Sequence, residues 1–370
     1  MTQGGIPHPR SAQSNRWQSL IAIAVVTLAN IGFIVAVMRN PPHTWMSSEH
    51  HLVNDTISAT PSNALKLSHP DMIPASPNLT LITITTTHPP FNSSLQLPFP
   101  VLENTSLTHL DLTVSSAGCP PMKTALIGIL SIPKLANTAR RNYLRQIYSN
   151  LNSKLPHDQQ IDFMYVFGRA LNPESETQLL LEKSMFPHDT IITHRKEGRD
   201  DGMIFDWFQE ARKMAFSPHP TRDGEWCQMY RYFGKSDDDA VVHIERLSRL
   251  LATFPQGQSN FVGKHALKDH LNMTHMTGMM YLLTAEILEW IFHSPIPREN
   301  LKGMEDVQVG KWLVLGAIEA SWIDVGTKFH NLPEADYFQK PVTNETAVVH
   351  WCKTETQFFK CVNGLNLDLL

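Results

Sequence analysis

The chain has 370 residues, which is enough for one large domain or two small ones. Hydrophobic residues make up 42% and charged residues 18%, so the chain can bury a sizeable core. The net charge is -4, which gives no sign of a nucleic-acid partner, since proteins that bind polyanions present positive charge. Four cysteines are too few for a disulfide scaffold, although an even count is compatible with two bridges.

The first predicted element is a membrane-spanning helix over residues 20–38, LIAIAVVTLANIGFIVAVM, which carries no charged side chain. A helix needs about 20 apolar residues to cross a bilayer. A secretory signal has a shorter apolar core of roughly 7–15 residues followed by small residues, which this run lacks. A buried core helix is the alternative, but Trp17 at one edge and Arg16 and Arg39 at the two ends favour the membrane.

The flanking charges predict how this helix is oriented. Arg10 and Arg16 precede the helix and only Arg39 closely follows it, so residues 1–19 are predicted to be a cytoplasmic tail. All acceptor triplets for N-glycosylation follow the helix, and with the four cysteines they fit a lumenal, oxidising compartment. These acceptors are Asn54, Asn78, Asn92, Asn104, Asn272 and Asn344.

Residues 39–118 are rich in Pro, Ser, Thr, His and Asn and show no sustained hydrophobic period. Four of the acceptor triplets lie in this segment. Such a composition cannot bury enough apolar surface to fold alone, so we expect a largely disordered lumenal stem. The short run at 79–87, LTLITITTT, is compatible with one isolated strand.

From Cys119 onward, apolar runs typical of buried strands alternate with segments of helical spacing. This alternation predicts an α/β domain over residues 119–370, with a mostly parallel sheet covered on both faces. Ligands bind such sheets at the carboxyl ends of strands. The predicted strands are 124–130, 161–168, 189–193 and 226–239, and the predicted helices are 136–151, 173–186, 201–216 and 243–254.

Three adjacent carboxylates, Asp237, Asp238 and Asp239, stand at the end of the last of these strands. Asp237 and Asp239 can point to the same side, because side chains alternate along an extended segment. Oxygen ligands of this kind suit Mg²⁺ or Mn²⁺, which commonly also hold substrate phosphates. A solvated acidic turn is the alternative interpretation.

A second acidic pair, Glu305 and Asp306, opens a predicted helix. The pair can complement the helix dipole, or one member can act as a general base at the mouth of a cleft. The residues themselves leave both interpretations open.

The C-terminal part adds a histidine and a cysteine pair. His350 ends a short apolar strand, where a lone histidine is more often structural than a ligand. Cys352 and Cys361 close a short loop and are candidates for a disulfide, with Cys119 and Cys227 as the second pair, although four cysteines allow three connectivities.

Seven short motifs occur in order between residues 123 and 355. They are Arg140 to Tyr148, Phe167 to Gly168, Gly234 to Asp239, Phe261 to Gly263, Thr277 to Thr284, Met304 to Gly310, and Val349 to Lys353. Each motif is weak alone, but their joint order and spacing are specific. Together they resemble glycosyltransferase family 31, the β-1,3-galactosyltransferase and N-acetylglucosaminyltransferase group, which includes Fringe-like enzymes.

The resemblance implies a GT-A fold, which is one Rossmann-like α/β domain that binds a nucleotide sugar. It implies that Asp237, Asp239 and His350 hold Mn²⁺ or another divalent metal. It implies that Asp306 is the catalytic base. Further implied residues are the nucleotide-sugar contacts Arg140, Arg145, Lys235, Asp237 and Asp238, and the donor or acceptor pocket residues Gly278 and Glu305.

The reaction that the resemblance implies is an inverting β-1,3 transfer from a UDP-sugar, with galactose as the family default. The acceptor would be a glycan, glycoprotein or glycolipid in the Golgi lumen. The alternatives are a Fringe-like or other-linkage transferase, and an inactive lumenal glycan-binding or scaffold relative. Met203 stands where the family often carries Lys, which motivates the inactive alternative; the retained candidate ligands and base argue against it.

Overall fold

The computed structural model describes residues 113–198, 200–266 and 274–367. The predicted tail, membrane helix and all but the last residues of the predicted stem lie outside this part, as do Asn54, Asn78, Asn92, Asn104 and Asn272. Among the described helices, none combines the length and the apolar character that crossing a membrane requires.

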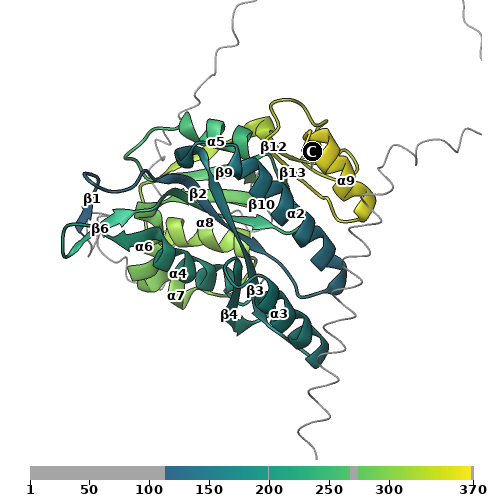
Figure 1. Cartoon of the computed structure of the whole chain (residues 1–370), viewed down its shortest axis with the longest axis horizontal. Coiled ribbons are helices and arrows are strands. Elements are labelled where there is room, and N and C mark those ends of the chain that lie inside the picture. Colours follow the sequence, from purple (N-terminus) through teal and green to yellow (C-terminus); the bar gives the residue numbers. More distant parts are fainter. Residues whose placement is uncertain (1–112, 199, 267–273, 368–370) are drawn as a thin grey trace, which may run out of the picture. The chain divides into compact units, whose positions relative to one another are not determined.

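The centre of the fold is a seven-stranded sheet in the order β11-β9-β10-β7-β2-β3-β4 (Figure 1). Neighbouring strands are parallel except where β10 pairs with β7 and β9. The predicted mostly parallel α/β sheet is therefore confirmed. The strands are β2 (Lys123–Leu130), β3 (Ile161–Arg169), β4 (Thr190–Lys196), β7 (Tyr230–Asp237), β9 (Asn260–Ala266), β10 (His275–Thr284) and β11 (Ser321–Asp324).

Helices cover the sheet on both faces, and two hydrophobic clusters fill the spaces between them. Along β2, Ile127 and Ile129 face one cluster, whereas Leu126 and Leu130 face the other, as side-chain alternation requires. The described α-helices are α2 (Leu135–Ser153), α3 (Pro173–Met185), α4 (Met203–Ala215), α5 (Ile244–Ala252), α6 (Ala285–His293), α7 (Pro295–Glu299), α8 (Glu305–Leu315) and α9 (Glu355–Gly364). Short 3-10 turns lie at His157–Gln159 and Gly326–Lys328.

A small outer sheet corrects two expectations. It contains β1 (Thr113–Ser115), β6 (Glu225–Gln228) and β5 (Phe216–Pro218) in the order β1-β6-β5. The predicted strand 226–239 is therefore two strands, β6 and β7. The chain changes partner at Met229, whose backbone amide donates to the Ala215 carbonyl oxygen at 2.8 Å while its carbonyl oxygen accepts from the Lys123 amide at 2.9 Å. Strand β1 lies inside the predicted stem, where pairing with β6 and the Cys119–Cys227 disulfide hold the chain.

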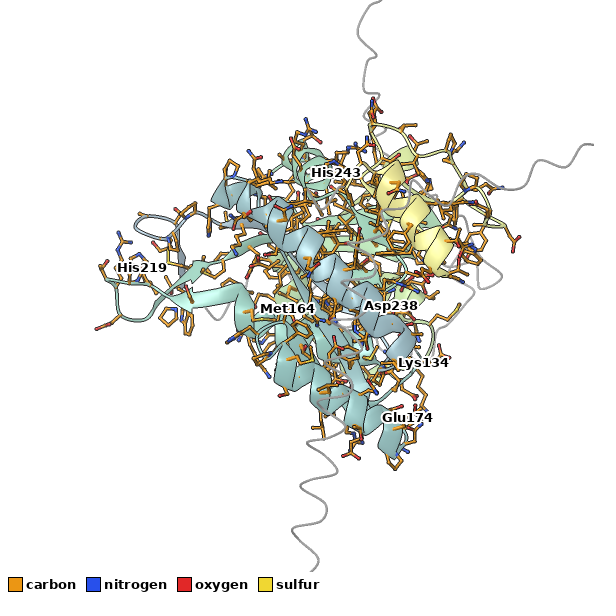
Figure 2. All side chains as sticks on the ribbon, turned by 45° about the vertical axis from the view of Figure 1, so that its right-hand side comes forward. Lys134, Met164, Glu174, His219, Asp238 and His243 are labelled. Atoms are coloured by element: carbon orange, nitrogen blue, oxygen red, sulfur yellow. A yellow bond between two sulfur atoms is a disulfide. The ribbon has the colours of Figure 1, made fainter. Side chains whose placement is uncertain are left out.

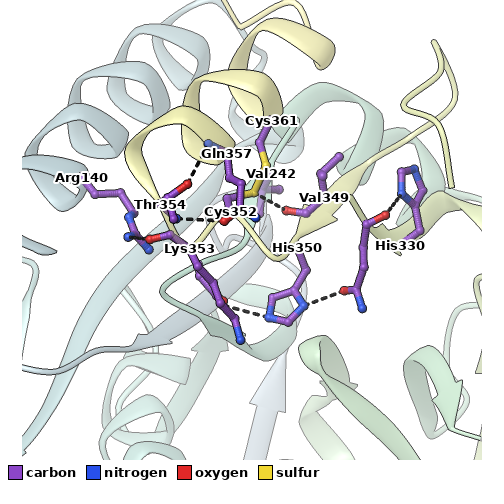
Figure 3. Close-up of a disulfide and its surroundings, with 12 residues drawn as sticks. Arg140, Val242, His330, Val349, His350, Cys352, Lys353, Thr354, Gln357 and Cys361 are labelled. Atoms are coloured by element: carbon purple, nitrogen blue, oxygen red, sulfur yellow. Dashed lines mark hydrogen bonds and ion pairs between the residues drawn. A yellow bond between two sulfur atoms is a disulfide. The ribbon is translucent and has the colours of Figure 1, made fainter. Parts of the chain in front are cut away.

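A third sheet brings the C-terminal segment back to the centre. Its strands are β12 (Phe329–Asn331), β13 (Val348–His350) and β8 (Val241–Val242), in the order β12-β13-β8. The amide of Cys352 donates to the Asp239 carbonyl at 2.9 Å, and the Cys352–Cys361 disulfide ties α9 to the same turn (Figure 3). The strand that carries His350 is thus fixed beside the acidic run.

Candidate active site

The predicted metal ligands Asp237, Asp239 and His350 lie together. Nε2 of His350 is 2.8 Å from Oδ1 of Asp239 and 3.4 Å from Oδ2 of Asp237. One possible ligand atom from each residue lies within 4.8 Å of the others. Asp237 ends β7, which is flanked by β2 and β10, so the cluster sits at the carboxyl end of a central strand.

Asn331 orients the imidazole of His350. The Asn331 side-chain oxygen lies 2.7 Å from Nδ1 of His350, and since that oxygen only accepts, Nδ1 carries the proton (Figure 3). Nε2, which faces Asp237 and Asp239, is therefore the nitrogen that can bind a metal when the metal displaces its proton. Sequence reasoning missed Asn331, because it faces His350 only through the parallel pairing of β12 with β13.

The cluster is electrostatically suited to a cation. Burial opposes protonation of His350, but hydrogen bonds to Asp237 and Asp239 raise its pKa to about 9. Burial also opposes ionisation of Asp237, yet Lys235 and His350 hold the pKa of this carboxyl well below its usual range. The carboxylates thus attract positive charge, and two carboxylates with one neutral imidazole fit a divalent cation such as Mn²⁺.

A second group of potential ligands, Cys119, His219 and Cys227, does not fit a metal. The two sulfurs are bonded to each other, so neither is a thiolate. The Nε2 atom of His219 lies 2.9 Å from the Ala117 carbonyl oxygen. This group belongs to the outer sheet and has a structural role.

Lys235, predicted as a nucleotide contact, is engaged by other groups of the site. Its fully buried ammonium donates to Asp237, the Gly278 carbonyl and Glu305 at 2.5, 2.8 and 3.2 Å. Burial disfavours its charge, but Asp237 and Glu305 raise its pKa. An ammonium has three donors, and all are used. Lys235 therefore positions the two carboxylates and balances the negative charge of Glu305.

Asp306 lies in the first turn of α8 and faces the same point as Asp237. Its Oδ1 accepts from the Val307 amide at 2.8 Å, which directs Oδ2 elsewhere. A Cβ atom placed on Gly278 would lie 3.2 Å from Oδ2 of Asp237 and 3.5 Å from Oδ2 of Asp306. The absence of a side chain at Gly278 therefore leaves space between the candidate metal ligands and the candidate base.

Asp238 points toward α2 rather than toward His350. Its Oδ2 accepts from Ser131 and Asn137 at 2.7 and 2.9 Å, close to the start of α2 (Figure 2). Burial raises its pKa. Arg140 donates to the Asp238 carbonyl at 3.2 Å and to the Lys353 carbonyl at 2.8 Å (Figure 3). Sequence reasoning missed Ser131 and Asn137, although Ser131 directly follows β2, where ligand-facing residues are expected.

Arg145 lies away from the acidic run, and its predicted contact with the nucleotide stays a prediction. Its guanidinium donates to Asp189 at 2.7 Å and to Glu182 at 2.6 Å, and lies over the rings of Tyr165 and Phe186. These partners belong to the junction of α2, α3 and β4 rather than to the acidic run. The side chain stabilises the fold there, since a guanidinium fits paired carboxylates and stacks on aromatic rings.

Residues 159–293 match the family model that is described as Fringe-like. This part of the chain is similar to Fringe-like domains. The resemblance to glycosyltransferase family 31 is thereby confirmed, and the domain is of glycosyltransferase type. The matched residues include Asp237, Asp239 and Gly278, whereas Asp306 and His350 follow the matched segment.

No curated protein matches the chain in sequence. Among solved structures, it is similar to a glycosyltransferase involved in glycosylation of the major capsid of PBCV-1, with 11% identity, coverage of 65% of this chain and 98% of that chain, and a TM-score of 0.33. It is also similar to the galactosyltransferase LgtC in complex with donor and acceptor sugar analogs, with 11% identity, coverage of 66% and 95%, and a TM-score of 0.35. Similarities at these TM-scores carry no argument about function.

Proposed function

We propose that the chain is a metal-dependent, inverting glycosyltransferase that moves a sugar from a UDP-sugar to a glycan hydroxyl. Galactose and a β-1,3 linkage are the defaults of family 31. The observation that carries the proposal is the convergence of Asp237, Asp239 and His350 beside Asp306, with Gly278 leaving space between them.

Asp237, Asp239 and His350 would hold Mn²⁺ or another divalent cation. When bound, the cation supplies neutralisation of the negative charge on the donor diphosphate and on the departing UDP. Two residues of the chain arrange the ligands before a cation binds. Lys235 keeps Asp237 ionised, and Asn331 holds the His350 ring so that Nε2 faces the two carboxylates.

Asp306 would act as the general base. Its Oδ2 accepts the proton of the acceptor hydroxyl, while the Val307 amide fixes the other oxygen. The acceptor oxygen forms a bond to the anomeric carbon on the face opposite UDP, and the bond from that carbon to the diphosphate oxygen breaks. One displacement inverts the configuration, so an α-linked donor gives a β-linked product.

We also propose a Golgi membrane location with the catalytic domain in the lumen. Two disulfides are typical of oxidising compartments. Asn344 is exposed, as an occupied glycosylation site must be. Residues 20–38 would be the membrane anchor of this single-pass protein.

The family match favours one alternative, a Fringe-like enzyme with another donor or linkage. A screen of UDP-sugar hydrolysis, including UDP-galactose and UDP-N-acetylglucosamine, tests both without knowledge of the acceptor. We expect hydrolysis of one donor with Mn²⁺ and its loss with a chelator. A protein that neither binds UDP with Mn²⁺ nor hydrolyses any donor would contradict both enzyme functions and would support the inactive scaffold.

The inactive alternative rested on Met203. In the structure Met203 begins α4 and is buried in the hydrophobic cluster beneath it. An apolar residue suits that position, so this departure from the family pattern supplies no argument against activity.

A further inference from the structure

One exposed aromatic side chain lies close to the candidate active site. Tyr337 is 51% exposed, and no other Phe, Tyr or Trp among residues 113–198, 200–266 and 274–367 is classed as exposed. It belongs to the connection between β12 and β13. An exposed apolar side chain is ordinary by itself, so its neighbours decide whether it has a role.

The ring of Tyr337 continues a row of rings that starts at His350. The centroid of Trp351 lies 6.1 Å from that of His350, and the centroid of Tyr337 lies 5.8 Å from that of Trp351. The contact between Tyr337 and Trp351 is edge-on, with an interplanar angle of 77°. We refer to Tyr337 and Trp351 as the aromatic shelf. The shelf extends from a candidate metal ligand to the solvent.

The two rings of the shelf differ in what they offer a ligand. The ammonium of Lys353 lies 3.4 Å from the centroid of Trp351, so it covers one face of that ring. Tyr337 makes edge-on contacts with Phe338 and Trp351, and half of its side chain remains open. Tyr337 is therefore the part of the shelf on which a ligand can lie, and Trp351 supports it.

The shelf is held in place before any ligand binds. The side-chain nitrogen of Asn331 donates to the Tyr337 carbonyl at 2.8 Å, and the Asn331 amide donates to the Phe338 carbonyl at 3.0 Å. Phe338 and Trp351 have φ of +52° and +71°, values that bulky residues adopt only when the surrounding contacts enforce them. The same buried Asn331 side chain orients His350, so the shelf and the candidate metal site share one support.

The shelf lies beside the candidate metal site, because Trp351 directly follows His350 in the chain. Burial raises the pKa of Tyr337, and the charges of Asp237, Asp239 and Asp306 raise it further. These shifts agree with the ring contacts that place Tyr337 near the candidate site.

We propose that the aromatic shelf binds a sugar ring of the acceptor, with Tyr337 stacked against the apolar C–H face of the pyranose. The inference rests on the proposed function. A pyranose has an apolar face and a polar rim, which match the apolar ring and polar hydroxyl of a tyrosine. The acceptor fits better than the donor, because Tyr337 lies two rings outward from His350 and is open to solvent, whereas the donor would be held through its diphosphate at Asp237 and Asp239.

The test uses the full chain in detergent and compares Tyr337→Ala with Tyr337→Phe. Leu180→Ala is the matched control, because Leu180 is 61% exposed on α3. Methyl glycosides are the probes, since they lack an aromatic aglycone, and saturation-transfer NMR with UDP and Mn²⁺ reports which of them the protein contacts. Transfer rates are then measured with the glycoside that wild type contacts most strongly.

We expect Tyr337→Ala to raise the acceptor KM about tenfold and to lose the NMR contact, because one aromatic stacking interaction is removed. UDP affinity and UDP-sugar hydrolysis should stay within twofold of wild type. Tyr337→Phe and Leu180→Ala should bind the glycoside like wild type, since both keep the ring.

Three results would overturn the inference. These are unchanged glycoside contact and KM in Tyr337→Ala, a loss confined to UDP binding, and a wild type that binds UDP but contacts none of the glycosides. Failure of wild type to bind UDP is a different result, which would contradict the proposed function itself.

Discussion

Glu305 and Asp306 are adjacent acids that the sequence could not tell apart, and their partners now separate them. Glu305 neutralises the buried ammonium of Lys235, whereas Oδ2 of Asp306 faces the space beside Gly278. We expect Asp306→Asn to lower the transfer rate by about 10²–10⁴-fold, because an amide cannot take the proton. UDP–Mn²⁺ affinity measured by calorimetry should be unchanged, since the candidate ligands remain. A variant that keeps most of its turnover would remove Asp306 from the mechanism.

Replacing Asn331 measures how much its hydrogen bond to His350 contributes to metal-dependent UDP binding. Asn331→Ala should weaken Mn²⁺-dependent UDP binding by about 10–100-fold, because His350 loses the acceptor that fixes its tautomer. Asp239→Ala, which removes a ligand atom, should abolish this binding. Calorimetric titrations with and without Mn²⁺ measure both. Equal affinity in Asn331→Ala and wild type, with an unchanged melting temperature, would contradict the role of Asn331.

Site residues could be predicted where local sequence positions them, and could not where contacts between distant parts of the sequence do. Asp237 and Asp239 could be predicted from the sequence, because a strand end and alternating side chains are local properties. Asn331 could not, since its partner His350 is reached only by strand pairing. Arg145 fits the family motif, but the motif does not reveal that Glu182 and Asp189 occupy its guanidinium.

At the scale of an element, Gly310 controls how closely α8 approaches β10. A Cβ atom there would lie 2.5 Å from the Thr274 carbonyl oxygen. Gly310→Ala should destabilise the fold by about 1–3 kcal/mol despite better helix propensity, and it should lower turnover by displacing Asp306. Val314→Ala, at an exposed position of α8, is the control. Urea unfolding and initial rates measure the effect. Equal unfolding free energies and rates for Gly310→Ala and Val314→Ala would show that α8 can shift without cost and would contradict this prediction.

His243 precedes α5 and makes the stability of this helix depend on pH. Its Nδ1 accepts from the Arg246 amide at 3.5 Å, which requires a neutral ring. Burial and then the charge of Arg246 lower the pKa of His243 to about 4, whereas the unfolded value is about 6.5. Between these values the unfolded chain binds more protons, so the free energy of unfolding falls as pH falls.

Because the ring is only partly buried, solvent screening limits this loss to about 1–2 kcal/mol between pH 6.5 and 4. Above pH 6.5 His243 contributes no pH dependence. His243→Asn keeps a capping acceptor without the titration, so urea unfolding at several pH values should show a smaller loss in this variant. Parallel pH curves for the variant and wild type would contradict the assignment.

For the whole molecule, strand order and layers were predictable where the pattern is periodic. The alternation of β2, α2, β3, α3 and β4 is visible in the sequence, as is the helix α5. The split between β6 and β7 was missed, since the run WCQMYRYF over residues 226–233 contains no Gly, Pro or other turn residue to mark the change in direction at Met229. The order before Cys119 was missed because it depends on a partner strand and a disulfide distant in sequence.

The ordered structure that begins at β1 leads to a prediction for the chain as a whole. Residues 113–367 contain both hydrophobic clusters and the candidate site, so a fragment from residue 113 to residue 370 should fold and bind UDP with Mn²⁺ without detergent. The full chain should stay in the membrane pellet after alkaline extraction, because residues 20–38 would hold it there. Release of the full chain into the soluble fraction would contradict the proposed anchor.

A second fragment that starts at residue 120 isolates the contribution of the N-terminal bridge. It lacks β1 and the Cys119–Cys227 disulfide, which closes a sequence separation of 108 residues. A bridge of this span constrains the unfolded chain, so its loss should cost about 2–4 kcal/mol and lower the melting temperature. Cys119→Ser in the longer fragment separates the bridge from the strand. If the fragment from residue 120 and the Cys119→Ser variant both have the same melting temperature as the longer fragment, neither β1 nor the disulfide stabilises the domain, and this prediction is wrong.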